Sequence, residues 1–228
     1  MENSTKQPNT AVVAAIVLIL GLGVGFGVAK AINHNSTPTT TTATAVPAAD
    51  TKAGDLRATL VSLGVQHMDL TDQAVDAALD GAPNAAAAKA DLISNGQSIS
   101  AAVGSIYGQA AQDKFQGLWN THLTDFVNYA VAAKTGNQAA KTAALTDIND
   151  NYTKPISQLL SGANPNLPEA TLETAFGDHV TMTAQMIDLH VSGKYTEEAA
   201  MRAMGDQHLE GLMSTLAGAI VKQYPSKF

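Results

Sequence analysis

The chain has 228 residues, of which 45% are hydrophobic, 5% aromatic and 14% charged, and its formal net charge is −7. Because an acidic chain with so few arginines offers little to a phosphate backbone, we expect no nucleic-acid partner. The chain has no cysteine, so it forms no disulfide and has no thiolate to act as a nucleophile or metal ligand.

The N-terminal residues predict a short tail (1–9) followed by a transmembrane anchor (10–32). Thr10 to Ala29 is an apolar stretch without a charge, and a helix of twenty residues is about 30 Å long, the thickness of a bilayer core. The alternative is a signal peptide, because Ala29-Lys30-Ala31 resembles a cleavage site. The tail is hardly basic, however, so we favour a retained single-pass anchor over secretion after cleavage.

Residues 33–54 are rich in Thr, Pro and Ala and contain almost nothing that could join a core. Such a composition predicts an extended, disordered linker. A linker beside a membrane anchor holds a domain away from the bilayer. We therefore expect residues 55–228 to lie outside the cytoplasm at the cell membrane, where they could meet a protein partner.

From residue 55 onward the hydrophobic periodicity is helical, which predicts an all-α domain. The expected helices cover 55–80, 84–106, 113–135, 138–160, 168–192 and 196–223. Pro155 lies inside the fourth of these and should kink or split it, because proline removes a backbone donor from the helix interior.

The six helices group into three tandem copies of one helical hairpin of about 56 residues. Three histidines hold the same place in the first helix of each copy, 55 and 57 residues apart: His67, His122 and His179. Three glycines that end these helices repeat at the same offsets: Gly81, Gly136 and Gly193. The hairpins should stack as a short open solenoid or close into a six-helix bundle, and the sequence leaves both arrangements open.

Each hairpin is expected to place a polar pair across its two helices, since the paired residues stand almost equally far from the turn glycine. The expected pairs are His67 with Asn95, His122 with Asn151, and His179 with His208. In the simpler interpretation they form a structural polar layer that sets helix register, because a buried imidazole needs a hydrogen-bond partner.

A second interpretation is a copper-type metal site in the third hairpin, where five of the seven methionines lie. The candidate ligands are His179, His208, Met182, Met186 and Met204. Imidazole binds copper and zinc, and a thioether favours Cu(I), so copper would be the cofactor. The alternative is that these methionines simply fill the core.

Other chemistry finds less support in the sequence. Two facing histidines would suit haem, but no C-x-x-C-H attachment motif is present. No Glu precedes a His by three residues, as a di-iron site requires. The chain also lacks G-x-S-x-G, H-E-x-x-H and P-loop motifs. The prediction is a non-enzymatic binding or structural module, with an extracytoplasmic metal-binding protein as the alternative.

Tyr107-Gly108, then Leu118-Trp119-x-x-His122 followed by aromatic residues, and a closing Gln223-Tyr224-Pro225-x-x-Phe228 form one pattern. The pattern resembles uncharacterised secreted bacterial proteins with helical-hairpin repeats, sometimes found beside copper amine oxidase N-terminal-like domains. The resemblance covers most of 55–228 and implies a secreted or surface-attached protein of the bacterial cell envelope. It transfers no oxidase activity, because the oxidase cofactor and copper site belong to a different domain.

Overall fold

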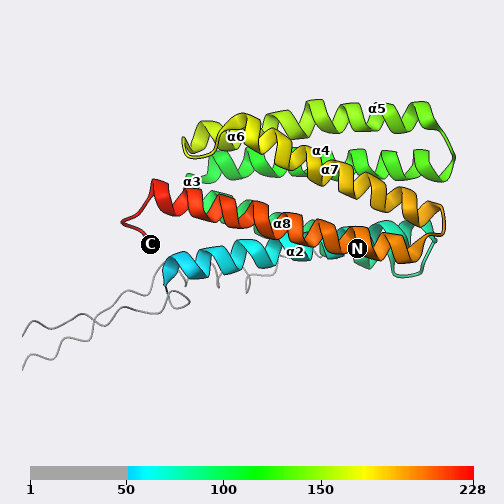
Figure 1. Ribbon diagram of the computed structural model, residues 1–228, viewed down its shortest axis with the longest axis horizontal. Helices are drawn as coiled ribbons and strands as arrows, with labels where there is room; N and C mark the ends of the chain where they lie inside the picture. Colours follow the sequence, from blue (N-terminus) through cyan, green and yellow to red (C-terminus); the bar gives the residue numbers. More distant parts are fainter. Residues whose placement is uncertain (1–50) are drawn as a thin grey trace, which may run out of the picture.

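Residues 51–228 are described by the computed structural model, and every regular element among them is helical (Figure 1). The expected all-α class is confirmed for this part of the chain. The elements are α2 (Lys52–Leu79), α3 (Ala85–Tyr107), α4 (Gln109–Lys134), α5 (Gln138–Ile148), a π-helical turn (Asn149–Thr153), α6 (Lys154–Ala163), α7 (Glu169–Val191) and α8 (Tyr195–Gln223). The expected anchor at 10–32 lies outside the described residues. No helix within 51–228 is long and apolar enough to cross a membrane.

The three hairpins close into a bundle of six helical rods, the fourth of which comprises α5, the π-helical turn and α6. The second helix of each hairpin packs against the first helix of the next: α3 against α4, α6 against α7, and α8 against α2. The last of these contacts joins the two ends of the described chain, so the arrangement is a closed bundle and not an open solenoid. The first helices, α2, α4 and α7, also contact one another and form an inner triangle.

The turns inside the hairpins share one backbone geometry. Three glycines with positive φ, of 65°, 67° and 68°, follow the first helices: Gly81, Gly136 and Gly193. The next residue in each case, Ala82, Asn137 or Lys194, donates its N–H to the carbonyl five residues earlier, at 2.8, 2.9 and 2.9 Å. This is the Schellman motif, in which glycine adopts the left-handed conformation without a steric penalty. The predicted glycine caps are therefore confirmed.

The fourth helical rod is split, as expected from Pro155. The proline is the second residue of α6, where its missing N–H costs little. The π-helical turn directly before it uses i→i+5 hydrogen bonds and so holds one extra residue. Because of that extra residue, a stripe of side chains at every fourth position of this rod faces the core. The stripe consists of Ile148, Tyr152, Ile156 and Leu160.

Two helix starts differ from the expectation by three or more residues. α2 begins three residues early, inside the predicted linker, because the Thr51 side chain accepts a hydrogen bond from Gly54 N at 3.0 Å and caps the helix there. α4 begins at Gln109 and not at 113, because Gly108, with φ of 88°, connects it to α3 in a single residue.

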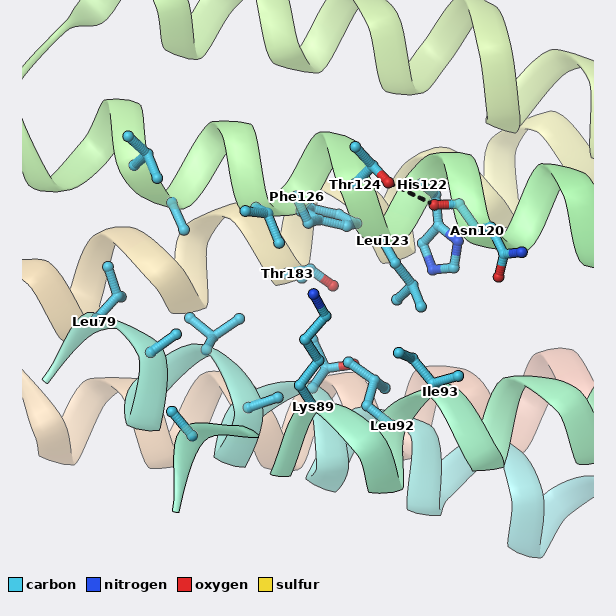
Figure 2. A pocket seen from close by; sticks show the side chains of 18 of the residues that line it. Leu79, Lys89, Leu92, Ile93, Asn120, His122, Leu123, Thr124, Phe126 and Thr183 are labelled. Atoms are coloured by element: carbon cyan, nitrogen blue, oxygen red, sulfur yellow. Dashed lines mark hydrogen bonds between the residues drawn. The ribbon is translucent and has the colours of Figure 1, made fainter. Parts of the chain in front are cut away.

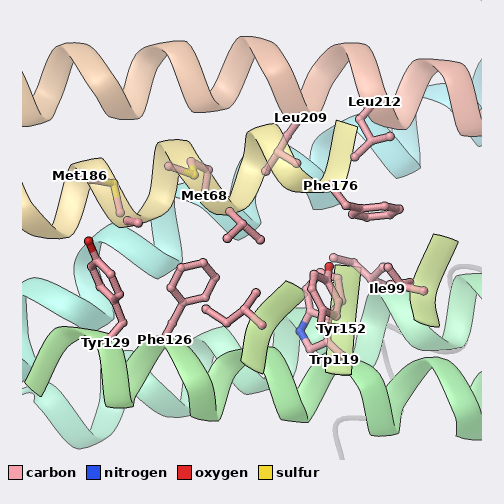
Figure 3. Close-up of a cluster of buried hydrophobic side chains, with 14 of the residues drawn as sticks. Met68, Ile99, Trp119, Phe126, Tyr129, Tyr152, Phe176, Met186, Leu209 and Leu212 are labelled. Carbon is pink, nitrogen blue, oxygen red and sulfur yellow. The ribbon is translucent and has the colours of Figure 1, made fainter. Parts of the chain in front are cut away.

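The main hydrophobic core lies where the inner helices meet (Figure 3). α4 supplies most of its aromatic side chains, and α2 and α7 add methionine and phenylalanine. The labelled residues at its centre include Met68, Trp119, Phe126, Tyr129, Tyr152, Phe176 and Met186. This packing fixes the inner helices against each other and hence the histidines that they carry.

Candidate metal centre

Three histidines meet at the centre of the inner triangle, one from each first helix. They are His67 on α2, His122 on α4 and His179 on α7, and their exposed fractions are 2%, 1% and 3%. One ring nitrogen from each lies within 4.8 Å of those of the other two. The ring centroid of His67 lies 5.7 Å from that of His122 and also 5.7 Å from that of His179. We call these residues the histidine triad.

The triad is uncharged at neutral pH because it is buried. Burial lowers the pKa of His122 to about 3 and that of His179 to about 4. Burial also lowers the pKa of His67 well below its usual range, and the neighbouring imidazoles lower it further. A neutral imidazole has a free lone pair, so these side chains are in the form that binds a metal ion.

The Nδ1 atoms of all three histidines are buried without a hydrogen-bond partner among the described residues. Buried polar atoms in proteins ordinarily have a partner, so three such atoms in one cluster are unusual. Ligands of a tetrahedral zinc-type ion stand about 3.4 Å apart, given metal–nitrogen bonds of about 2.0–2.1 Å. In the structure the clustered nitrogens lie within 4.8 Å of one another, so an ion would draw them closer together.

The surrounding side chains fix the orientation of the rings. The Trp119 ring lies 4.5 Å from that of His67 and 4.8 Å from that of His122. Tyr152 stacks on His122 at 4.3 Å, with an angle of 18° between the rings. Ligands that are held in place by packing lose little entropy when they bind an ion.

A cavity of about 800 Å³ connects the triad to the surface between α2, α3 and α4 (Figure 2). All three histidines line it, together with Thr71 and Thr183. The hydroxyl groups of these threonines donate to the backbone carbonyls of His67 and His179, at 2.7 and 2.9 Å. The cavity gives an ion or a small molecule a route to the triad.

The structure distributes the metal ligands expected in the third hairpin over different surroundings. His179 joins the triad, whereas the Nε2 of His208 donates to the Ala175 carbonyl at 2.8 Å. Met186 is buried in the main core, Met182 is half-buried, and Met204 is 52% exposed. Of the five expected ligands, His179 alone belongs to the triad.

The expected polar pairs are formed in part. Asn95 crosses the first hairpin, where its Nδ2 donates to the Leu63 carbonyl at 3.0 Å and to Gln66 Oε1 at 3.1 Å, close to His67. The expected pair of His122 with Asn151 is not formed, because Asn151 is exposed. The extra residue of the π-helical turn shifts the register, and Tyr152 occupies the position that faces His122.

The sequence analysis missed a second cluster, where α2, α7 and the start of α8 meet. His190 Nδ1 lies 2.9 Å from Asp76 Oδ1 and 3.0 Å from Glu198 Oε1, and its Nε2 lies 3.2 Å from Asp80 Oδ1. Burial and the Glu198 carboxyl raise the pKa of Asp76 to about 7. Burial opposes the charge on His190, but the hydrogen bond to Asp80 and the nearby acids raise its pKa.

This second cluster also has donor atoms spaced closely enough for a metal ion. Its histidine nitrogens already face carboxylates, whereas the triad Nδ1 atoms have no partner, so the triad is the stronger candidate. The sequence did contain a signal for the second cluster, since Asp80, His190 and Glu198 all lie within five residues of Gly81 or Gly193 at one end of the bundle.

The fold and the site together define a closed six-helix bundle with a buried histidine cluster. Compared with known proteins, the chain matches no protein-family model, no curated protein and no solved structure.

Proposed function

We propose that the described bundle is a non-enzymatic metal-binding module that holds one copper-type ion at the histidine triad. The observation that carries this proposal is the meeting of three buried, neutral imidazoles whose Nδ1 atoms have no partner among the described residues. Imidazole is a good ligand for copper and zinc. The triad replaces the third-hairpin ligand set as the proposed site, with His179 common to both.

Charge favours Cu(I) over a divalent ion at this site. The three ligands are neutral, and the group of clustered donor atoms contains no carboxylate that would offset a positive charge. The cost of burying an ion rises steeply with its charge, so a monovalent ion loses less on entering the core. Zn²⁺ is the competing ion because it also accepts three imidazoles.

For the location, we propose that the bundle is held outside the cytoplasm at a bacterial cell membrane by residues 10–32. The uncharged N-terminal stretch and the resemblance to secreted hairpin-repeat proteins support this part of the proposal. Secretion after cleavage is the alternative. In either case the bundle would bind its ion in the cell envelope, where a protein partner could deliver or receive it.

The experiment is an anaerobic Cu(I) titration of the purified full chain in detergent, followed by a Zn²⁺ titration. We expect one Cu(I) per chain, bound at least 100-fold more weakly in His122→Leu. The matched control is His208→Gln, which changes a histidine outside the triad and should bind like the parent chain. Unfolding curves establish that both variants are folded.

The opposite pattern would overturn the proposal. If folded His122→Leu binds copper like the parent chain, the triad is a packing element only. Loss of binding in His208→Gln would instead return the site to the third hairpin. Tight binding of Zn²⁺ with weak binding of Cu(I) would keep the triad as a metal site but change the ion.

A further inference from the structure

The cavity beside the triad is far larger than a metal ion requires. Its volume is about 800 Å³, within the range of pockets that hold organic ligands. Its lining along α4 and the C-cap residue of that helix runs from Asn120 to Thr135, a distance of about 22 Å along the helix axis. A cavity of this volume and length has room for an elongated molecule.

Most of the residues that line the cavity are apolar, and many of them are aliphatic. Leu92 and Ile93 on α3 face Leu123 on α4 across it (Figure 2). Val127 and Val131, which also line it, are 56% and 58% exposed and are among the most exposed large hydrophobic side chains in 51–228. Exposed valines beside a mostly apolar cavity are typical of a ligand site.

The cavity carries positive charge although the protein is acidic. No Asp or Glu lines it, whereas Lys89 and Lys134 do. Lys134 donates to the Leu79 carbonyl. Lys89 is exposed, lines the cavity from α3 and points toward α4 (Figure 2), and it has no hydrogen-bond or ion-pair partner among the described residues.

The first turn of α3 adds to this positive potential. Ala85 and Ala86 in that turn line the cavity, and the side chain of the N-cap residue, Asn84, makes no capping hydrogen bond. The N-terminal end of a helix carries a partial positive charge that favours an anion nearby. An anionic group beside Lys89 would therefore be stabilised by the ammonium group and by the helix end.

We infer that the cavity binds a free long-chain fatty acid, with its hydrocarbon tail against the aliphatic side chains of the lining and its carboxylate on the Lys89 ammonium group. A carboxylate suits a single lysine, because one ammonium group matches one negative charge. This inference goes beyond the proposed function and does not depend on a metal at the triad. The tail would lie next to the triad and would exclude water from it.

The test uses the full chain in lipid nanodiscs, a palmitate analogue with a diazirine in its tail, and mapping of the labelled peptides at pH 8. We expect labelling within the cavity segments of α2, α3 and α4. Excess palmitate should compete with it, and uncharged hexadecanol should compete at least tenfold less well. Labelling of a membrane-embedded segment would act as an internal reference, because it does not depend on the cavity.

Two variants test separately what the charge and the volume of the cavity contribute to binding. Lys89→Gln should reduce cavity labelling at least tenfold, and Ala86→Trp, which places a large ring at the opening, should abolish it. The matched control is Lys114→Gln, because Lys114 is an exposed lysine on α4 that does not line the cavity. Labelling confined to segments outside the cavity, or labelling unchanged in folded Lys89→Gln, would overturn the inference.

Discussion

The ring of Tyr152 stacks on the imidazole of His122, with 4.3 Å between the ring centroids. This contact joins the π-helical turn to the histidine triad. We expect Tyr152→Ala to lower the free energy of unfolding by about 3–5 kcal/mol, because it removes a fully buried aromatic ring. Urea denaturation at pH 7 measures the change.

The matched variant for that experiment is Tyr152→Phe, which keeps the ring and removes only the hydroxyl group. Its free energy of unfolding should stay within about 1.5 kcal/mol of the parent value. An equally large loss in Tyr152→Phe would show that the hydroxyl group, and not the stacking on His122, is what this position requires.

The helices and their turns could be predicted from the sequence because their causes are local. Apolar spacing sets each helix, and a glycine such as Gly81 ends it by adopting a left-handed conformation that other residues avoid. The repeat offsets then placed His67, His122 and His179 at equivalent positions. When the ring closes, three equivalent positions on the core-facing sides of their helices face one centre.

The grouping of those histidines could not be predicted, because it depends on whether the ring closes. In an open solenoid each histidine would face only its own hairpin. The expected neighbour of His179 in its hairpin, His208, does lie close enough to lower the pKa of His179, but the meeting with His67 and His122 needs the closed ring. Closure is decided by the packing of α8 against α2, a contact between the two ends of the described chain. Similarly, no local sequence pattern predicted the π-helical turn, which places Tyr152 opposite His122 where Asn151 was expected.

Gly96 on α3 allows the indole of Trp119 to approach the backbone. A Cβ atom at position 96 would overlap the Nε1 and Cδ1 atoms of Trp119, so Gly96→Ala should destabilise the bundle by about 1–3 kcal/mol. Gly117→Ala on α4 is the control, since a Cβ atom there meets nothing within 4 Å. It should stabilise the bundle by about 0.5–1 kcal/mol. Thermal unfolding of both variants checks the opposite signs.

The histidine triad should make the bundle sensitive to acid. The folded-state pKa values of His122 and His179, about 3 and 4, lie below the value of about 6.5 in the unfolded chain. The unfolded state therefore takes up protons first, and stability falls as the pH falls below 6.5. Between pH 7 and pH 5 each of these two histidines should cost about 2 kcal/mol. Urea unfolding of His122→Leu across this range should show a smaller loss than the parent chain.

The second cluster should make the bundle less stable as the pH rises, whereas the triad makes it less stable as the pH falls. The folded-state pKa of Asp76 is about 7, above its ordinary value, and that of His190 is also raised. Both groups therefore favour the folded state when protonated, and their contribution is lost as the pH rises. Asp76→Asn should come within about 0.5 kcal/mol of the parent chain at pH 4 and exceed it by about 2 kcal/mol at pH 8, after allowance for solvent screening. If the free energies of unfolding of parent and variant differ by the same amount at both pH values, the raised pKa of Asp76 is contradicted.

Metal loading should stabilise the bundle and should persist in acid. An ion at 100 times its dissociation constant adds about 2.7 kcal/mol to the free energy of unfolding, and this gain should vanish in His122→Leu. Histidines at the surface would lose about 30-fold in affinity each between pH 7.5 and pH 5, because protons compete for their nitrogens. At the triad, protons compete only near the lowered pKa values of about 3 and 4. Copper affinity of the parent chain at pH 5 should therefore stay within threefold of its value at pH 7.5, and a steep loss over that interval would place the ion on exposed histidines.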